Sequence, residues 1–296
     1  MKAKDALLLV LLAAIWGSSF IFMRYLSPIL GPVLTATIRT LASGVVLCVF
    51  FAMTRVRLDW RKNFRHYAIV GLANSAIPFL LFSWAALKIP AAVSSIANSM
   101  SPLWGAIFAA LILGEIFTVR KLAGLGLGIA GVAVISLFGK DSPVGVVDLI
   151  PILACVLATV LYGFSGTYIK RWASDVPSRS MTAASLLVAG LALLPLAATQ
   201  APTATVIPVS VWIVAFVFSI LCSAIAYLIY FRLIASAGVT RALSVTLLIP
   251  VFAFLWGYLF LGETVRPAAF AGAALVLSGT ALITGKGKAG SSPAVK

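Results

Sequence analysis

The chain has 296 residues, of which 62% are hydrophobic and only 10% are charged, and its mean hydropathy is +1.14. Soluble domains are roughly half apolar and about one quarter charged, so this composition excludes an ordinary water-soluble protein. The net charge of +15 does not indicate a nucleic-acid partner, because the basic residues separate apolar runs instead of forming one polar domain. The composition therefore predicts a multi-pass membrane protein surrounded by the lipid bilayer.

A bilayer core about 30 Å thick takes roughly 20 apolar residues per helix. By this measure the sequence predicts an all-α membrane protein with ten transmembrane helices. In chain order the expected spans are 6–23, 32–53, 67–87, 91–113, 119–138, 149–169, 179–198, 209–233, 239–261 and 267–284.

The loops between the spans carry unequal charge, and this asymmetry predicts the orientation of the chain. The loop between spans two and three contains five basic residues, namely Arg55, Arg57, Arg61, Lys62 and Arg65. Lys and Arg concentrate in cytoplasmic loops, and most of the 22 basic residues fall on the same side as this loop. Both termini are therefore expected to be cytoplasmic.

One segment of the first half recurs in the second half, 148 positions later and without a gap: 75–135 and 223–283. Because each half has an odd number of spans, the second copy must enter the membrane in the opposite orientation. Inverted repeats are typical of transporters, whose halves move about a central site. We expect five-helix repeats at 1–138 and 148–284, an external linker at 139–147 and a disordered cytoplasmic tail at 285–296.

Arg39 is the most informative single residue. It lies roughly 12 Å inside span two at 1.5 Å per residue, whereas all seven acidic residues fall near span ends or in loops. A central arginine costs about 2.5–3.5 kcal/mol to insert, so it should face the bundle interior. Two interpretations stay open: Arg39 orients a substrate carboxylate, or it holds backbone carbonyls of a broken helix.

Polar and aromatic residues recur within the inner spans, and together they predict the lining of a substrate site. In chain order the candidates are Trp16, Arg39, Asn74, Ser75, Phe79, Ser83, Asn98, Trp104, Tyr162, Ser223, Tyr227, Tyr230, Ser244 and Thr246. Small polar residues also act as packing contacts between membrane helices, and a single deep aromatic ring more often packs against a neighbour. For any one candidate, packing is therefore an equally good interpretation.

Three prolines fall inside predicted spans, namely Pro78, Pro102 and Pro250. A proline within a helix removes a backbone hydrogen bond and can bend the helix. Pro102 and Pro250 are equivalent in the repeat, so we expect pseudo-symmetric hinges that allow one half to gate. A static kink is the alternative interpretation.

These residues resemble the drug/metabolite transporter superfamily and, within it, the ten-helix EamA-type exporters. The resemblance is carried by Ile15, Trp16, Gly17, Ser18 and Ser19, by Arg39, and by the stretches 102–115 and 250–263, each of which ends in Leu-Gly-Glu. Length and aromatic content look most like the aromatic amino-acid exporter (YddG-like) branch. The resemblance implies a bacterial inner-membrane protein with a central cavity lined mainly by spans three, four, eight and nine.

The expected function is the export of small metabolites, with amino acids including aromatic ones as the expected substrate class, by alternating access. The alternatives are proton-coupled multidrug or cation efflux, and a lipid-scrambling or structural membrane protein. The sequence shows no nucleotide-binding loop, metal-ligand spacing or nucleophile with acid and histidine partners, so we expect no enzyme, no cofactor and no metal. A monomer and a homodimer are both compatible with the sequence.

Overall fold

A computed structural model describes residues 3–138, 149–200, 206–238, 242, 244–264 and 267–284, and these residues form helices and connecting turns without a strand. The first half contains α1 (Ala3–Leu30), α2 (Pro32–Met53), α3 (Trp60–Gly71), the π-helical turn η1 (Leu72–Ala76), α4 (Ile77–Ala85), α5 (Ala91–Asn98), α6 (Ser101–Leu113) and α7 (Val119–Phe138). The second half contains α8 (Leu149–Trp172), α9 (Ser178–Thr199), α10 (Val209–Ser219), the π-helical turn η2 (Ile220–Ile225), α11 (Ala226–Ala237), α13 (Val245–Leu261) and α14 (Pro267–Thr284).

The all-helical membrane fold is confirmed. Within the described residues, seven helices or continuous helix runs are long and apolar enough to cross a bilayer, and α13 and α14 are shorter apolar helices. α7 occupies the predicted fifth span. Span three begins earlier than predicted, at Trp60, so Arg61 and Lys62 lie in the first turn of α3 instead of in a loop.

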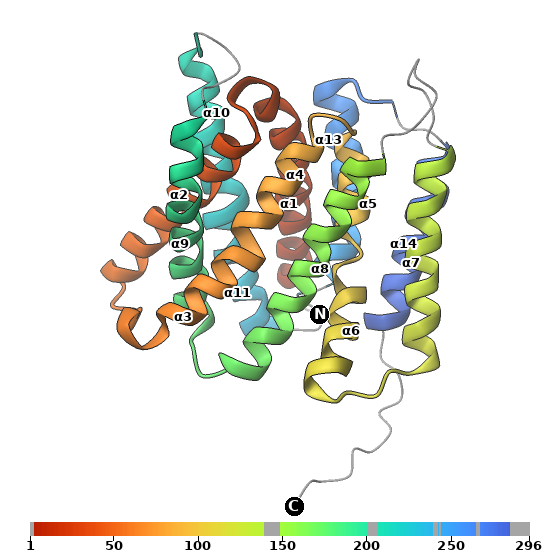
Figure 1. The fold of residues 1–296 in the computed structure, drawn as a ribbon, viewed down its shortest axis with the longest axis horizontal. Coiled ribbons are helices and arrows are strands. Elements are labelled where there is room, and N and C mark those ends of the chain that lie inside the picture. Colours follow the sequence, from red (N-terminus) through yellow and green to blue (C-terminus); the bar gives the residue numbers. More distant parts are fainter. Residues whose placement is uncertain are drawn as a thin grey trace, which may run out of the picture.

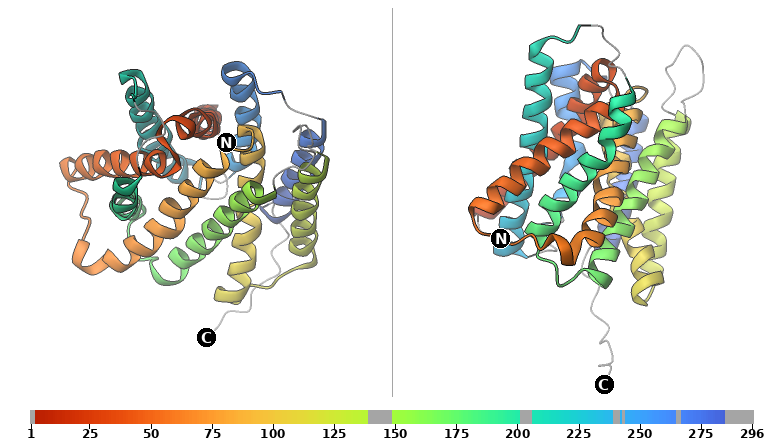
Figure 2. Two further views of the ribbon diagram at one scale, coloured as in Figure 1. Left: turned by 45° about the horizontal axis from the view of Figure 1, so that its top comes forward. Right: turned by 60° about the vertical axis from the view of Figure 1, so that its left-hand side comes forward.

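The two halves have opposite orientations. In Figure 1, α1 runs upward from the end marked N, whereas α8 begins in the upper half of the picture and runs downward, as does α14. Figure 2 shows the same bundle from two further directions, with α7 and α14 at one side and the crossed pair α2 and α9 at the other. The architecture is therefore that of an inverted repeat.

Glycines bring equivalent helices of the two halves into backbone contact. A Cβ added to Gly190 on α9 would lie 2.6 Å from the Cα of Leu41 on α2. On the other side of the bundle, a Cβ on Gly131 of α7 would lie 2.6 Å from the carbonyl oxygen of Gly272 on α14. Small residues allow this approach in membranes, so the glycine-rich faces serve packing within one chain.

Two further crossings lie nearer the centre and are also related by the repeat. A Cβ added to Gly17 on α1 would lie 2.7 Å from the Cβ of Phe252 on α13. A Cβ added to Gly163 on α8 would lie 2.6 Å from the backbone nitrogen of Gly105 on α6. Each half therefore inserts its first helix against the fourth helix of the other half.

The prolines do not occupy equivalent places, which differs from the expectation of symmetric bends. The fourth span is broken, and Pro102 stands in the first turn of α6, whereas Pro250 lies inside the continuous helix α13. Pro78 stands in the first turn of α4, directly after η1. A proline in a first helical turn loses no intrahelical hydrogen bond, so Pro102 is compatible with the start of α6. Pro78 lies inside the continuous helix run Trp60–Ala85, where a proline has no amide to donate to the preceding turn. Their role as hinges stays a prediction.

Candidate functional site

Two π-helical turns, η1 in the first half and η2 in the second, contribute residues to the candidate site. η1 is closed by a bond from the Ile77 amide to the Leu72 carbonyl, and η2 by a bond from the Ala226 amide to the Leu221 carbonyl. The repeat relates the two turns, because η2 begins 148 residues after η1. π turns inside α-helices are rare and occur frequently at functional sites. Three candidate residues, Asn74, Ser75 and Ser223, lie on these turns.

Arg39 is buried between the halves, with 5% of its surface exposed. Its Nε donates to the Ser223 hydroxyl at 3.3 Å, and its two terminal nitrogens reach the Ser19 hydroxyl at 3.4 Å and the Met23 sulfur at 3.7 Å. The guanidinium carbon lies 3.7 Å from the centre of the Phe79 ring.

These partners of Arg39 are neutral side chains and an aromatic face. A second ring, that of Phe218, lies 4.9 Å from the guanidinium carbon. Cation–π contacts of this kind stabilise a desolvated guanidinium without neutralising it. Among the described residues no ion pair to Arg39 is formed. Arg39 therefore presents a net positive charge at the interface of the two repeats.

An aromatic cluster lies beside this charge. The Trp16 ring is 6.0 Å from Tyr227 in an edge-to-face arrangement and 5.4 Å from Tyr230. Tyr162 stacks with Phe82 at 6.3 Å. Tyr162 and Tyr227 lie close enough to Arg39 to interact with its charge. The Asn74 side chain forms a hydrogen bond with the Tyr227 side chain.

The structure thus places together Trp16, Arg39, Asn74, Phe79, Tyr162, Ser223, Tyr227 and Tyr230. Ser75 and Ser83 are buried nearby on the same span, and the Ser83 hydroxyl has no hydrogen-bond partner among the described residues.

The remaining candidates lie on spans four and nine. Asn98 ends α5, and its carbonyl accepts a hydrogen bond from Ser101 at 2.6 Å. Ser244 precedes α13, and Thr246 is in its first turn, where the Thr246 carbonyl accepts from Ser99 at 3.4 Å. Trp104 packs over Gly163, and its buried Nε1 has no acceptor within the described part of the chain.

Sequence reasoning missed several residues that contact Arg39. Ser19 and Met23 lie on α1, one and two turns beyond Trp16, and only Ser19 belongs to a motif that the sequence singled out. The repeat did not mark Phe218 as a candidate site residue, because the equivalent residue in the first half is Val70. Helical periodicity from Trp16 could have found Ser19 and Met23, whereas Phe218 required the structure.

The site offers one fixed cation, several hydroxyls and an aromatic wall, and this arrangement can bind an anionic group attached to an apolar body. No group of three His, Cys, Asp or Glu residues that could hold a metal ion occurs among the described residues. A helical membrane bundle with inverted halves and a polar charged centre defines a membrane transporter.

The chain belongs to the EamA-like transporter family, whose model matches residues 4–137 and again residues 149–285. It is 29% identical over 296 residues to an uncharacterized transporter, YvbV, of Bacillus subtilis, which covers 99% of this chain and 96% of that protein. It is 25% identical over 276 residues to a probable terminal-alkyne amino-acid exporter of Streptantibioticus cattleyicolor, covering 93% and 91% of the two chains.

A third relative is an S-adenosylmethionine/S-adenosylhomocysteine transporter of Chlamydia trachomatis, 26% identical over 286 residues, with 93% of this chain and 88% of that protein covered. A solved structure has the same fold, with a TM-score of 0.64 at 19% identity, and covers 95% of this chain and 96% of that one. These comparisons confirm membrane transport and the family.

Proposed function

We propose that the protein exports small carboxylate-bearing metabolites, with amino acids including aromatic ones as the preferred class. Transport proceeds by alternating access of two inverted five-helix repeats, 1–138 and 148–284. The chain resides in the inner membrane with both termini in the cytoplasm, as the distribution of basic residues indicates.

The observation that carries this proposal is the uncompensated charge of Arg39. A buried cation without an ionic partner is expensive in a membrane, so such a residue usually marks a substrate or ion path. The bonds from Arg39 go to Ser19, Ser223 and Met23 side chains instead of to backbone carbonyls. This geometry favours a substrate carboxylate over the alternative of a structural arginine that holds a broken helix.

The aromatic wall supports the apolar half of the substrate. Trp16, Tyr227 and Tyr230 form a continuous ring cluster, and aromatic faces bind other aromatic rings in offset or edge-to-face geometry. Two relatives are named for substrates, a terminal-alkyne amino acid and S-adenosylmethionine, that also carry an amino-acid carboxylate. The substrates of these relatives therefore support recognition of a carboxylate by this chain.

Proton-coupled efflux of cations is the second candidate, and the charge of the site disfavours it. Such efflux generally uses a membrane carboxylate that exchanges a proton for the substrate. Glu115 and Glu263 stand beyond the ends of α6 and α13, and both are engaged in ion pairs. A cation would also meet the positive charge of Arg39. The central site therefore suits a facilitator of carboxylates better than an exchanger of cations.

Uptake into proteoliposomes at equal internal and external pH tests the proposal. Radiolabelled phenylalanine, tryptophan and threonine are compared, with methyl viologen as the cationic probe. We expect saturable flux of phenylalanine or tryptophan without a proton gradient. Flux of methyl viologen alone, or flux only with a proton gradient, would overturn the substrate class, and phospholipid scrambling without solute flux would overturn transport of solutes.

A further inference from the structure

The corner between α2 and α3 presents a dense group of basic side chains to the outside of the bundle. Within residues 55–65 five basic residues stand against one acidic residue, Asp59. All five basic residues are exposed, namely Arg55, Arg57, Arg61, Lys62 and Arg65. Figure 1 shows this corner at the lower end of the bundle, where α3 begins. The corner therefore carries a strong positive charge on its outer surface.

Two hydrogen bonds fix the backbone of this corner to the rest of the bundle. The Arg57 carbonyl accepts a hydrogen bond from the Ser180 hydroxyl of α9 at 2.8 Å. The Leu58 carbonyl accepts a hydrogen bond from the Tyr67 hydroxyl of α3. Both donors, Ser180 and Tyr67, are fully buried on packed helices. The corner thus has a defined position on the bundle.

The side chains of the corner alternate between the bundle and the outside. Val56 and Leu58 are half-buried and pack against the core cluster that contains Phe51. Arg55 and Arg57, which precede each of these apolar residues, are exposed. The apolar contacts therefore keep the two arginines on the outer surface.

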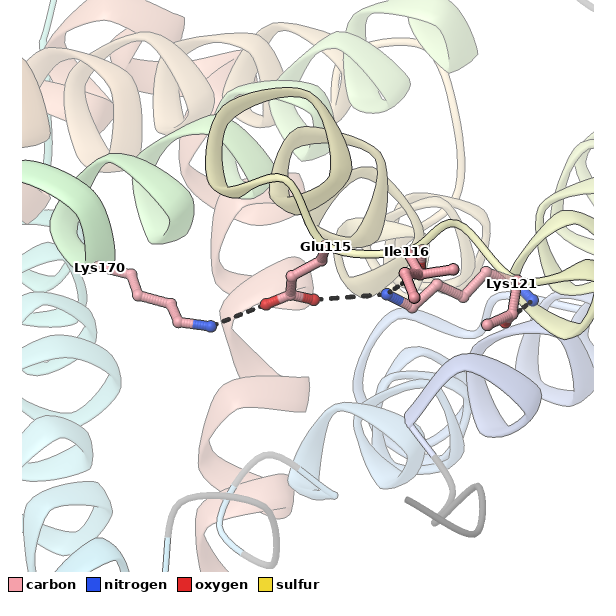
Figure 3. Close-up of polar contacts among 5 residues, drawn as sticks. Glu115, Ile116, Lys121 and Lys170 are labelled. Carbon is pink, nitrogen blue, oxygen red and sulfur yellow. Dashed lines mark hydrogen bonds and ion pairs between the residues drawn. The ribbon is translucent and has the colours of Figure 1, made fainter. Parts of the chain in front are cut away.

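Other basic residues at the same end of the bundle are paired with carboxylates. Glu115 accepts from the Lys170 ammonium at 2.8 Å and from the Lys121 ammonium at 3.4 Å, as Figure 3 shows. The Lys62 ammonium lies 3.2 Å from a carboxylate oxygen of Asp175. These lysines consequently have their charge balanced within the chain.

Arg55, Arg57 and Arg61 form no ion pair among the residues that the structure describes. Six residue steps separate the first from the last, so their Cα atoms lie within about 20 Å of one another. A guanidinium matches a phosphate with two parallel hydrogen bonds, which makes arginine the residue of choice for phosphate recognition. The three arginines thus offer unbalanced charge of a kind that suits a phosphate group.

A surface cavity of about 470 Å³ adjoins these arginines. Its lining comprises Asp59, Trp60, Arg61 and Lys62. Trp60 is half-buried, with its ring 5.4 Å from the Tyr67 ring, and tryptophan is typical of the membrane–water interface. Met53, at the end of α2, is 79% exposed and apolar. The corner therefore combines cationic, interfacial and apolar groups, as the phosphate, glycerol and acyl chains of a phospholipid require.

We propose that this corner binds the headgroup of an anionic phospholipid, such as phosphatidylglycerol, from the adjoining leaflet. Arg55, Arg57 and Arg61 hold the phosphate, Trp60 lies at the level of the glycerol, and Met53 contacts an acyl chain. Clusters of basic residues next to a membrane helix recognise anionic lipids in this way. The inference goes beyond the proposed function and needs only that the chain is inserted in a bilayer.

Native mass spectrometry of the full chain in a nonionic detergent tests this site, because the method resolves each bound lipid. Phosphatidylglycerol is compared with phosphatidylcholine of the same acyl chains, and inorganic phosphate serves as the soluble anion. We expect the first phosphatidylglycerol to bind roughly tenfold or more tightly than phosphatidylcholine. Equal binding of the two lipids would overturn the proposal, as would displacement of phosphatidylglycerol by an equal concentration of inorganic phosphate.

A triple variant of the corner locates the site. Arg55→Gln, Arg57→Gln and Arg61→Gln are combined, so that three charges are removed together. Each basic residue near an anionic lipid surface contributes roughly fivefold in affinity. The first phosphatidylglycerol should therefore bind roughly 100-fold more weakly to this variant than to the wild type.

A matched variant removes the same number of charges elsewhere. Lys4→Gln, Arg120→Gln and Arg232→Gln are combined, at exposed residues on the three separate helices α1, α7 and α11. This variant should bind phosphatidylglycerol as the wild type does. An equal loss of affinity in the two triple variants would mean a diffuse attraction by net charge and would overturn the site.

Photolabelling of the wild type keeps the test decisive if the corner variant fails to fold. Phosphatidylglycerol with a photoactivatable headgroup, in lipid nanodiscs, should label peptides that contain residues 53–62. Labelling confined to other peptides would overturn the proposal. Absence of phenylalanine flux would refute the proposed export but leave this lipid site standing, and loss of the lipid preference would have the opposite effect.

Discussion

The guanidinium carbon of Arg39 lies 3.7 Å from the centre of the Phe79 ring, although 40 residues separate the two in the chain. The ring covers one face of the guanidinium and leaves its nitrogens directed at Ser19, Ser223 and Met23. Phe79 thus fixes the plane of the charged group at the interface of the halves.

Replacing Phe79 by leucine should therefore weaken substrate binding. A cation–π contact contributes about 0.5–2 kcal/mol, so we expect the apparent affinity for phenylalanine to fall by roughly 2- to 30-fold. Uptake kinetics in proteoliposomes measure this change. Phe64→Leu, at a ring that is 57% exposed on α3, is the matched control and should leave the affinity unchanged. Equal affinities in the two variants would show that the ring does not position Arg39.

Gly163 and Gly166 both lie on α8 but differ in the space around them, so their alanine variants distinguish the effect of close packing from that of helix propensity. A Cβ on Gly163 would lie 2.6 Å from the Gly105 nitrogen, whereas a Cβ on Gly166 would meet nothing within 4 Å. We expect Gly163→Ala to destabilise the fold by about 1–3 kcal/mol because α6 and α8 must separate. Gly166→Ala should be neutral or slightly stabilising. Thermal unfolding in detergent compares the two, and equal melting temperatures would refute the close crossing.

Two tryptophans differ in whether the indole nitrogen is bonded. Trp256 donates to the Ala14 carbonyl at 3.0 Å, whereas the buried Trp104 nitrogen has no acceptor in the described structure. Trp256→Phe should therefore cost about 1 kcal/mol of stability, and Trp104→Phe should cost less. The unfolding midpoints of the purified variants measure this difference. A larger loss for Trp104→Phe would mean that its nitrogen is bonded in the folded protein.

The contributions of Glu263 and Glu115 to stability should respond to pH with opposite signs. Burial raises the pKa of Glu263 above its ordinary value of 4.5, with Arg24 and the Ala91 amide opposing the shift. The hydrogen bond from Lys170, with a smaller contribution from Lys121, lowers the pKa of Glu115. A raised folded-state pKa gives stability that is present at low pH and lost as pH rises through it; a lowered pKa gives stability that is lost as pH falls.

Melting temperatures of the wild type and two glutamine variants test these signs. As the pH falls from 7 towards 4.5, the melting temperature of the wild type should rise relative to that of Glu263→Gln. As the pH falls below 4.5, the melting temperature of the wild type should fall relative to that of Glu115→Gln. Parallel pH dependence for both variants would contradict the different environments of the two carboxylates.

The helical repeat and its inverted orientation could be predicted from the sequence, because apolar length, loop charge and a constant offset are local patterns. Much of the central cluster was also predicted, since Trp16, Arg39 and Tyr227 are unusual residue types at membrane depth. The turns η1 and η2 could not be predicted, because a π turn changes hydrogen bonding without changing hydropathy. Contacts such as Arg24 with Glu263 join distant parts of the chain, and only packing reveals them.

The central claim is that Arg39 binds the substrate carboxylate, and the concentration dependence of phenylalanine uptake in Arg39→Gln and Arg39→Lys tests it most directly. We expect the apparent affinity to fall about tenfold or more in Arg39→Gln and to recover in part in Arg39→Lys, because a charge-assisted hydrogen bond contributes about 1.5–3 kcal/mol. Arg65→Gln, at an exposed arginine on α3, should behave as the wild type. Normal affinity in Arg39→Gln with a lower yield of folded protein would contradict the account and make Arg39 a structural residue.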